Sequence, residues 1–482
     1  MTLVTRVLCS SLLAVSLGAC HHQSGGSHGG GGGDGGDGGG GGDLSGNAGG
    51  DSAVDDLRSH VNLSCANGGH TTLTGIVYAP NGTLPLYNAA VYVPNGTIEA
   101  FTEGVTCDRC DGKLSGDPVA KALTGSDGTF TLKDVPTGSD IPLVIQLGRW
   151  RRQVTIPTVA DCQTTPLTDP QTTRLPKNAS EGHMPHMAIV TGEADPLECL
   201  FLKLGIDAAE VSVPSGTGRI HFFRGTDSPG LDTSPSAPTA DTLYSSVDSL
   251  KKYDVVLVPC EGGAYDKSQV GGQALPTDPR GLFQQYLDAG GRLFSTHFSY
   301  DWLTYAGSPY NKVAKTQNNG LWPVGQKDDY NNTIATTLVN TFPKGVDFIA
   351  WLTAAGASSA PGTLNIKEGR SDLIDVDPAY AQAWATFDFS KDTNVDNGKP
   401  AVMHATFNTP LDAPPDDMGQ PQYCGRVVFS DFHATAGAVS DKTKPFPEAC
   451  ASGAMTDQEK ALAFMLFDLS SCVQKDSAVP IL

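Results

Sequence analysis

The stretch from Tyr253 to Trp302 constrains the fold more than any other part of the chain. Residues 255–258 form a short, continuous apolar run, which is typical of a strand buried on both faces of a parallel sheet. Residues 281–289 predict a helix with apolar side chains on one side, and Gly290 and Gly291 end it because glycine readily adopts positive φ. Residues 292–296 predict the next strand. The order of strand, loop, helix and strand is that of an open α/β sheet.

Segments on both sides extend this pattern. Upstream, strands are predicted at residues 187–190 and 219–223, and helices at residues 196–204 and 241–252. Downstream, helices are predicted at residues 330–342, 346–354 and 456–469, and strands at residues 363–366, 383–387, 401–405 and 426–429. The alternation predicts a doubly wound, flavodoxin-like parallel sheet in one domain of residues 186–473, followed by a tail of residues 474–482.

The region before this domain shows a different pattern of apolar residues, which is typical of short strands. Short strands are predicted at residues 71–78, 90–93, 130–132, 143–145 and 154–156, with turns rich in Pro, Asn, Asp and Gly between them. Short strands at this spacing predict an all-β sandwich over residues 63–165, and residues 166–185 read as a linker. With 482 residues, the chain is long enough for two or three domains.

The first residues carry export signals. Residues 1–19 combine one basic residue, Arg6, with an apolar run that ends in Leu17-Gly18-Ala19 before Cys20. This resembles the signal peptide of a bacterial lipoprotein, in which that cysteine is lipidated. His21 is not the aspartate that resembles an inner-membrane retention signal, so an outer-membrane lipoprotein on the periplasmic or cell-surface face is expected. The alternative is an ordinary signal peptide with Cys20 incidental. Residues 20–62 are glycine-rich and predict a disordered tether.

Charge and cysteine content narrow the partners and the compartment. A net charge of −20 argues against nucleic acid as a partner. Beyond Cys9 and Cys20, nine cysteines remain as disulfide candidates, and at least one must stay free or pair between chains: Cys65, Cys107, Cys110, Cys162, Cys199, Cys260, Cys424, Cys450 and Cys472. A pair of Cys199 with Cys260 is plausible. For Cys107 and Cys110, spaced CxxC, a loop disulfide is favoured over a redox or zinc motif.

Two family resemblances refine these predictions. The stretches LTGIVYAPNGTLPLYNAAVYVPN and ALTGSDGTFTLKDVPTG, the latter containing the hairpin of residues 124–138, resemble the carboxypeptidase regulatory-like, or transthyretin-like, sandwich. That resemblance implies a non-catalytic spacer or interaction module in a secreted protein.

The second resemblance concerns the α/β domain. The stretches YDVVLVPCEGG, LFQQYLDAGGRLFSTHF and CGRVVFSDFHA resemble the class I glutamine amidotransferase-like fold, including its ThuA-like members. His433 lies where that family has a histidine. His297 occupies the position of the family's nucleophilic cysteine, which ThuA-like members also lack, so glutaminase activity is not expected.

Candidate site residues follow from the rule that open α/β sheets bind ligands at the carboxyl ends of their strands. His297 and His433 end two strands, where they can act in proton transfer, hold a metal with an aspartate, or serve a structural role. Asp301 and Asp431 can orient them or accept protons, and Cys260 can be a nucleophile if it is not in a disulfide. Ligand contacts are predicted for four nearby residues, whose aromatic members can stack on a sugar or simply pack in the core: Glu261, Tyr300, Asp301 and Trp302.

Two functions remain open on this basis. The first is a lipid-anchored cell-envelope protein whose α/β domain binds an unknown ligand without catalysis. The alternative is an exported hydrolase that acts on a carbohydrate or an amide-containing envelope polymer through His297, His433, Asp431 and Cys260. The expected partners are the membrane, through the lipid anchor, and a carbohydrate or envelope polymer. No cofactor and no metal ligand are predicted.

Overall fold

The computed structural model describes residues 56–110, 114–192, 194–225, 237–263, 269–270, 273–274, 278–304, 306–316, 333–357, 360–391, 400–417, 419–434 and 444–481. The predicted signal peptide, Cys20 and most of the predicted tether therefore lie outside the described residues. Residues 54–482 form one compact unit, and the predicted domain boundaries within it stay predictions. No helix among the described residues is long and apolar enough to cross a membrane.

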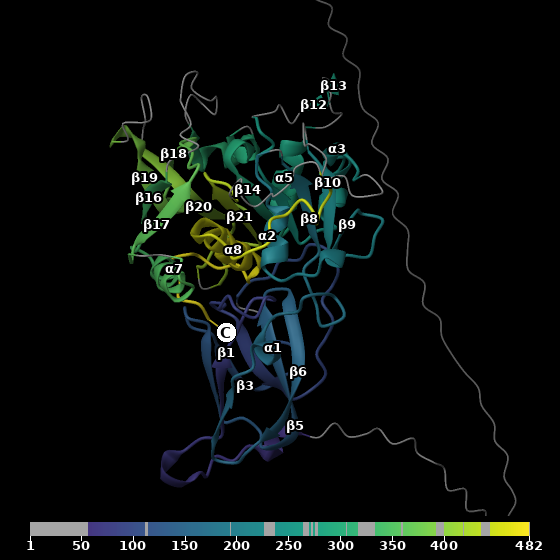
Figure 1. Cartoon of the computed structure of the whole chain (residues 1–482), viewed down its shortest axis with the longest axis vertical. Coiled ribbons are helices and arrows are strands. Elements are labelled where there is room, and N and C mark those ends of the chain that lie inside the picture. Colours follow the sequence, from purple (N-terminus) through teal and green to yellow (C-terminus); the bar gives the residue numbers. More distant parts are fainter. Residues whose placement is uncertain are drawn as a thin grey trace, which may run out of the picture. The chain divides into compact units, whose positions relative to one another are not determined.

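Two β-sheets build the first part of this unit, residues 63–167, here called the sandwich part (Figure 1). One sheet has the order β4 (Thr129–Lys133), β1 (Thr72–Ile76), β7 (Thr164–Leu167). The other has the order β3 (Pro118–Leu123), β2 (Ala90–Pro94), β5 (Gly138–Leu147), β6 (Trp150–Val159). Side chains alternate between buried and exposed along β4, as a half-buried strand requires. Leu73 and Phe130 of one sheet share a hydrophobic core with Val91 and Leu143 of the other. The sheets predicted from short alternating segments are present.

The second part, residues 186–473, is here called the α/β part and contains a ten-stranded sheet. Six strands run in parallel, in the spatial order β9 (Val211–Ser212), β10 (Ile220–Arg224), β8 (Met187–Thr191), β11 (Val255–Val258), β14 (Arg292–Thr296), β21 (Gly425–Ser430). Four antiparallel strands continue the sheet beyond β21: β20 (Pro400–Thr409), β19 (Ala381–Asp388), β16 (Thr333–Leu338), β17 (Thr363–Lys367). The prediction of a parallel sheet is therefore wrong for these four strands.

Both faces of the parallel half are buried, as the apolar run of β11 predicted. Val255 and Leu257 belong to one hydrophobic cluster, which includes Leu462 of α8 (Asp457–Ser470). Val256 and Val258 belong to another, which includes Leu282 of α5 (Pro279–Asp288). The α8 helix begins with a capping box of Thr456 and Glu459 and packs against β14, β17 and β21.

The remaining short elements complete the described chain: α1 (Pro170–Thr173), α2 (Glu198–Lys203), α3 (Ala240–Leu243), α4 (Val247–Leu250), β12 (Gln269–Val270), β13 (Gln273–Ala274), α6 (Asp301–Thr304), β15 (Ala314–Thr316), α7 (Pro343–Ala354) and β18 (Leu373–Val376). Strand β15 pairs with β18 in a separate ribbon, and β12 pairs with β13.

Two helix predictions differ from the structure. Residues 330–342 were expected to be helical, but the described part forms β16, in which Ile334, Thr336 and Leu338 are buried and their neighbours are exposed. This period of two fits a strand, and β-branched residues favour it. The helix expected over residues 241–252 is split into α3 and α4 at Ser246, whose side chain accepts a hydrogen bond from the Ser249 N–H as a helix cap.

The described residues form four disulfides: Cys65–Cys162, Cys107–Cys424, Cys110–Cys472 and Cys199–Cys450. They indicate a protein that folds outside the reducing cytoplasm. The expected loop disulfide between Cys107 and Cys110 is wrong, since each pairs with a cysteine more than 300 residues away. The expected Cys199–Cys260 pair is wrong too, because Cys199 on α2 lies 5.4 Å from Cys450 between Cα atoms. Cys260 is free and buried.

Candidate functional site

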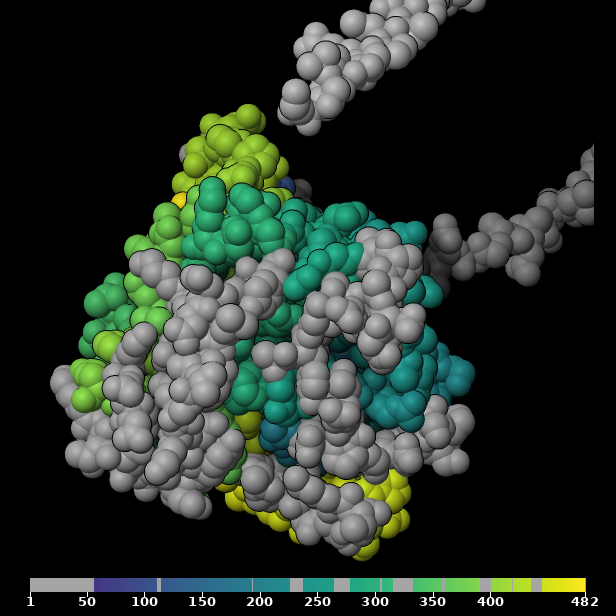
Figure 2. All heavy atoms as spheres, turned by 90° about the horizontal axis from the view of Figure 1, so that it is seen from above, coloured from purple at the N-terminus to yellow at the C-terminus, as the bar shows by residue number. Residues whose placement is uncertain are grey.

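The carboxyl ends of four adjacent parallel strands meet at one edge of the large sheet. Strands β8, β11, β14 and β21 are neighbours in the order β21-β14-β11-β8. Cys260 follows β11, His297 follows β14 and His433 follows β21, and all three side chains are buried. Figure 2 views the molecule from above, where segments of the α/β part, teal to yellow, reach the surface. The three residues therefore lie just past the carboxyl ends of strands, as predicted.

These three residues form a contact cluster, here called the Cys–His–His cluster. The Cys260 Sγ atom lies 3.1 Å from Nδ1 of His297, and the same Nδ1 lies 3.0 Å from Nε2 of His433. One donor atom from each residue falls within 4.8 Å of the others. Among the described residues, this is the group of His, Cys, Asp or Glu side chains at the sheet edge that is spaced closely enough to hold a metal ion.

His297 has an unusual backbone conformation. Its φ is +43°, in the left-handed region, and it is the first residue of the short 3-10 helix η4 (His297–Tyr300), directly after β14. Non-glycine residues avoid this region because Cβ crowds the backbone, and surrounding contacts must hold them there. A sharp turn between a strand and a helix presents a side chain at the end of a sheet, as in the nucleophile turn of many hydrolases. Here the turn presents an imidazole.

Asp195, which lies between β8 and α2, ties the strand ends together. Its Oδ2 accepts a 2.6 Å hydrogen bond from the Thr296 hydroxyl, and its Oδ1 accepts a 2.9 Å bond from the Ala434 N–H. The Thr296 hydroxyl oxygen in turn accepts from the Cys260 N–H at 3.0 Å. One buried carboxyl group therefore fixes the backbone next to all three members of the cluster. Its position after β8 is the signal that would have found it.

A second missed segment, residues 369–372, lies against the cluster. Asp372 places Oδ2 3.3 Å from Nε2 of His297, on the ring edge opposite the cluster. Arg370 is buried, and its positive charge acts on both imidazoles. Asp431, predicted to orient the histidines, has another contact: its Oδ2 accepts from the Leu373 N–H at 3.0 Å, and its carbonyl accepts from the Arg370 N–H at 2.8 Å. Asp431 therefore holds the segment that carries Arg370 and Asp372.

Burial controls the protonation of the cluster. Desolvation, followed by the positive charge of Arg370, lowers the pKa of His433 to about 3. Desolvation, the neighbouring His433 and Arg370 hold the pKa of His297 well below its ordinary value. Desolvation also raises the pKa of the Cys260 thiol to about 12. At neutral pH both imidazoles are therefore uncharged and offer lone pairs, and the isolated thiol keeps its proton.

Two buried carboxyl groups lie beside this site on the β8 side. Burial raises the pKa of Asp195 to about 7 and that of Glu198, the first residue of α2, to about 8. The negative charge of Asp195 adds to the shift at Glu198. Carboxyl groups that titrate near neutral pH can carry protons in catalysis, although structural pairs also show such shifts.

The four predicted ligand-contact residues are all buried. Trp302 packs between Phe283 and Tyr244, with ring centroids 4.2 and 4.9 Å away. Tyr300, Asp301 and Glu261 have exposed fractions of 2%, 3% and 3%. Trp302 therefore packs in the core, which is one of the two roles predicted for it; the other was stacking on a sugar. A ligand contact for these residues stays a prediction.

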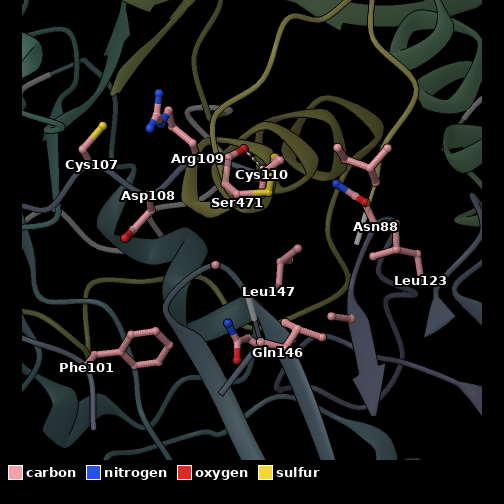
Figure 3. Close-up of a pocket in the computed structure, with 15 residues that line it drawn as sticks. Asn88, Phe101, Cys107, Asp108, Arg109, Cys110, Leu123, Gln146, Leu147 and Ser471 are labelled. Atoms are coloured by element: carbon pink, nitrogen blue, oxygen red, sulfur yellow. Dashed lines mark hydrogen bonds between the residues drawn. A yellow bond between two sulfur atoms is a disulfide. The ribbon is translucent and has the colours of Figure 1, made fainter. Parts of the chain in front are cut away.

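A separate cavity of about 310 Å³ lies elsewhere, between the sandwich part and the end of α8 (Figure 3). Its walls include Phe101, Arg109, Gln146, Leu147 and Ser471. No member of the Cys–His–His cluster lines it. It combines polar and apolar side chains.

Comparison with known proteins adds little. No protein family profile and no curated protein matches the sequence. Among solved structures, a putative ThuA-like protein from Bacteroides uniformis is 10% identical, with 51% of this chain and 80% of that chain covered and a TM-score of 0.27. A cytoplasmic protein from Salmonella typhimurium is 12% identical, with 59% and 99% covered and a TM-score of 0.30.

A cohesin–X-dockerin complex from Acetivibrio cellulolyticus is 18% identical over 22% of this chain, with a TM-score of 0.13, and this chain spans 56% of that protein. Similarities at these levels are too low to assign a fold family or a function. The two family resemblances drawn from sequence motifs therefore stay predictions.

Proposed function

We propose that this chain is an exported cell-envelope hydrolase, anchored through a lipid on Cys20, whose reaction centre is the Cys–His–His cluster. The observation that carries the proposal is the contact of both Cys260 and His433 with His297 at the carboxyl edge of a parallel sheet. The substrate class is a carbohydrate or an amide-containing polymer of the envelope. The sandwich part serves as a spacer or interaction module.

The cluster has the groups that hydrolysis requires. The neutral imidazoles of His297 and His433 can take a proton from an attacking water molecule, since each keeps a lone pair at neutral pH. Asp372, beside His297 Nε2, would stabilise the imidazolium that forms. The positive charge of the buried Arg370 would stabilise negative charge that develops on the substrate. Cys260 is not favoured as a free thiolate, because its pKa is raised to about 12.

A test of hydrolysis uses the full mature chain with its disulfides intact. Turnover of a panel of envelope glycans and amide-linked polymers should fall by at least about 100-fold in a His297→Ala, His433→Ala double variant. His186→Ala is the matched control, because His186 directly precedes β8 and so lies at the opposite end of the parallel strands. Circular dichroism of each variant checks folding. Turnover that is equal in the wild type and the double variant would refute the proposal.

The alternative hypothesis, in which the α/β part binds a ligand without catalysis, predicts a different outcome of this test. A domain that binds without catalysis should show no turnover of any polymer in the panel. It should retain the same polymer with equal affinity in the wild type and the double variant.

The anchor has its own test. Metabolic labelling with radioactive palmitate should mark the wild-type chain and not a Cys20→Ser variant, and the variant should leave the membrane fraction. Equal labelling of both chains would exclude Cys20 as the lipid attachment site.

A further inference from the structure

We infer that the Cys–His–His cluster is a zinc site, with Sγ of Cys260, Nδ1 of His297 and Nε2 of His433 as its three protein ligands. The inference rests on the proposed reaction centre and deepens it by naming the ion that would act there. It assigns all three side chains the role of ligands, so Cys260 is not a nucleophile and the two imidazoles would bind the ion instead of accepting a proton from water. The argument has four steps: the spacing of the donor atoms, the orientation of His297, the surroundings of the sulfur, and the choice of ion.

The spacing of the donor atoms fits one cation. Zinc in tetrahedral coordination, with Zn–S of about 2.3 Å and Zn–N of about 2.0–2.1 Å, holds its ligand atoms roughly 3.3–3.6 Å apart. The two contacts of His297 Nδ1, at 3.1 Å to Cys260 Sγ and 3.0 Å to His433 Nε2, are only a few tenths of an ångström shorter. All three donor atoms lie within 4.8 Å of one another. Small side-chain shifts would therefore admit the ion.

The orientation of His297 points its lone pair at the cluster. Its Nε2 lies 3.3 Å from Oδ2 of Asp372 in an ion-pair contact without hydrogen-bond geometry, and the negative charge there favours the tautomer with the proton on Nε2. The Nδ1 atom then offers only a lone pair, and it faces a thiol and a second imidazole nitrogen at once. One lone pair satisfies one hydrogen-bond donor well, whereas a cation satisfies all three groups together. A carboxylate behind a histidine is the usual support of a metal-bound imidazole.

The sulfur also has the surroundings of a bound thiolate. The Gly262 N–H donates to Cys260 Sγ at 3.4 Å, and the backbone of Phe298 hydrogen-bonds the same atom. Such donors stabilise negative charge on sulfur. The other eight cysteines of the described chain are all in disulfides, so Cys260 stays reduced in a protein that is otherwise fully oxidised. Burial together with a bound ion would protect it.

The donor set selects the metal. One thiolate and two imidazoles suit zinc, whereas calcium and magnesium require oxygen ligands. Three protein ligands leave a fourth position for water, which is the arrangement of catalytic zinc sites. The same set of ligands can also bind copper, and the experiment distinguishes the two metals by spectrum.

The test measures metal in the purified mature chain after oxidative folding. Elemental analysis should find about one zinc per chain. Replacement of zinc by Co²⁺ should give the visible absorption of a tetrahedral site and a near-ultraviolet band from sulfur-to-cobalt charge transfer. Cys260→Ser should abolish the charge-transfer band, and His433→Gln should lower zinc occupancy sharply, while His186→Ala should change neither. Asp372→Asn should weaken zinc affinity roughly 10–100-fold, as the loss of such a supporting carboxylate does elsewhere.

Each outcome decides the inference. Absence of stoichiometric metal from the folded wild type, or full zinc and an unchanged cobalt spectrum in Cys260→Ser, overturns it. An intense blue copper complex that zinc cannot displace overturns the choice of zinc. Cobalt spectra of the wild type decide the matter even if a variant does not fold. Zinc without turnover refutes the proposed hydrolase but leaves the site, whereas a folded wild type that holds no metal but hydrolyses a polymer refutes the site and leaves the hydrolase.

Discussion

Cysteine serves opposite purposes in two regions of this chain. In the loop between β2 and β3, Cys107 and Cys110 are paired with Cys424 and Cys472, and these two disulfides form what we call the clasp between the sandwich part and the α/β part. At the end of β11, Cys260 is free and fully buried beside two histidines.

The comparison shows that local spacing is a weak guide to cysteine chemistry. The CxxC pattern, the one cysteine motif in the chain with a redox or metal-binding meaning, is structural and joins distant segments. Cys260 has no motif of its own. Its role depends on neighbours that the sheet brings from 37 and more residues away. The following tests separate the two regions, beginning with the largest expected effect.

Opening the clasp should reduce stability more than any change at Cys260. Replacing Cys107, Cys110, Cys424 and Cys472 by serine should lower the free energy of unfolding by roughly 2–5 kcal/mol or more, because both links close loops of over 300 residues. Replacing either pair alone should lower the free energy of unfolding by less, since the other disulfide still restricts the unfolded chain. Denaturant titration followed by tryptophan fluorescence measures these differences.

Cys260→Ser is the control for that series. It should leave the midpoint of the same titration nearly unchanged in metal-free protein, while the clasp variants should keep the cobalt spectrum of the wild type. A clasp variant that loses cobalt binding but remains folded would show that the two regions are coupled.

The next largest effect should appear in thiol labelling, which distinguishes the disulfides of the clasp from the free Cys260. In denatured, unreduced protein, one thiol per mature, lipidated chain should react, and peptide mapping should locate it at Cys260. In the native protein the reaction should be at least about a thousandfold slower, because Cys260 has an exposed fraction of 0% and requires local or global opening. Fast labelling of native Cys260 at neutral pH would instead indicate an activated thiolate.

The buried carboxyl group of Glu198, next to Cys199, should make stability depend on pH. Its pKa is raised from 4.5 to about 8 by burial, so the folded state keeps a proton that the unfolded state releases. This contribution is present below about pH 4.5 and is lost as the pH rises toward 8. In Glu198→Gln the loss should be absent, so the variant should gain up to a few kcal/mol relative to the wild type between pH 5 and 8.

Unfolding titrations of wild type and variant at pH 5 and pH 8 measure this difference in stability. Glu181→Gln is the control, because the pKa of Glu181 is shifted in the opposite direction. Hydrogen bonds from Arg174 lower the pKa of Glu181 to about 2. Parallel pH profiles for wild type and Glu198→Gln would contradict the prediction.

The smallest effect should come from the hydroxyl that supports the Cys260 backbone. Thr296→Val keeps the shape of the side chain but leaves the Cys260 N–H and an Asp195 oxygen without this partner. The expected cost is about 1–3 kcal/mol, with a faster reaction of native Cys260 toward thiol reagents. Thr336→Val, a buried threonine on β16 with one hydrogen bond to a carbonyl, is the matched control and should not change the labelling rate.

Much of the fold was determined by local sequence. Apolar runs such as residues 255–258, turn residues between the sandwich strands, and the capping box at Thr456 each specify an element through short-range physics, and the structure contains these elements. The prediction from side-chain periodicity was wrong at β16. Buried and exposed residues alternate there as in a strand, but a helix was predicted. The sequence also placed His297, His433 and Cys260 at strand ends, because that position follows from the chain order alone.

Only the tertiary structure decided which of these residues meet. The direction of β16, β17, β19 and β20 depends on how the chain returns to the sheet, which no local pattern encodes. The same holds for all four disulfide partners and for Asp195, Arg370 and Asp372. Contacts between residues far apart in sequence arise when strands and helices bury shared apolar surface, and this packing brings polar groups together that carry no motif. The pKa shifts of the cluster have the same origin, since burial is a property of the folded chain.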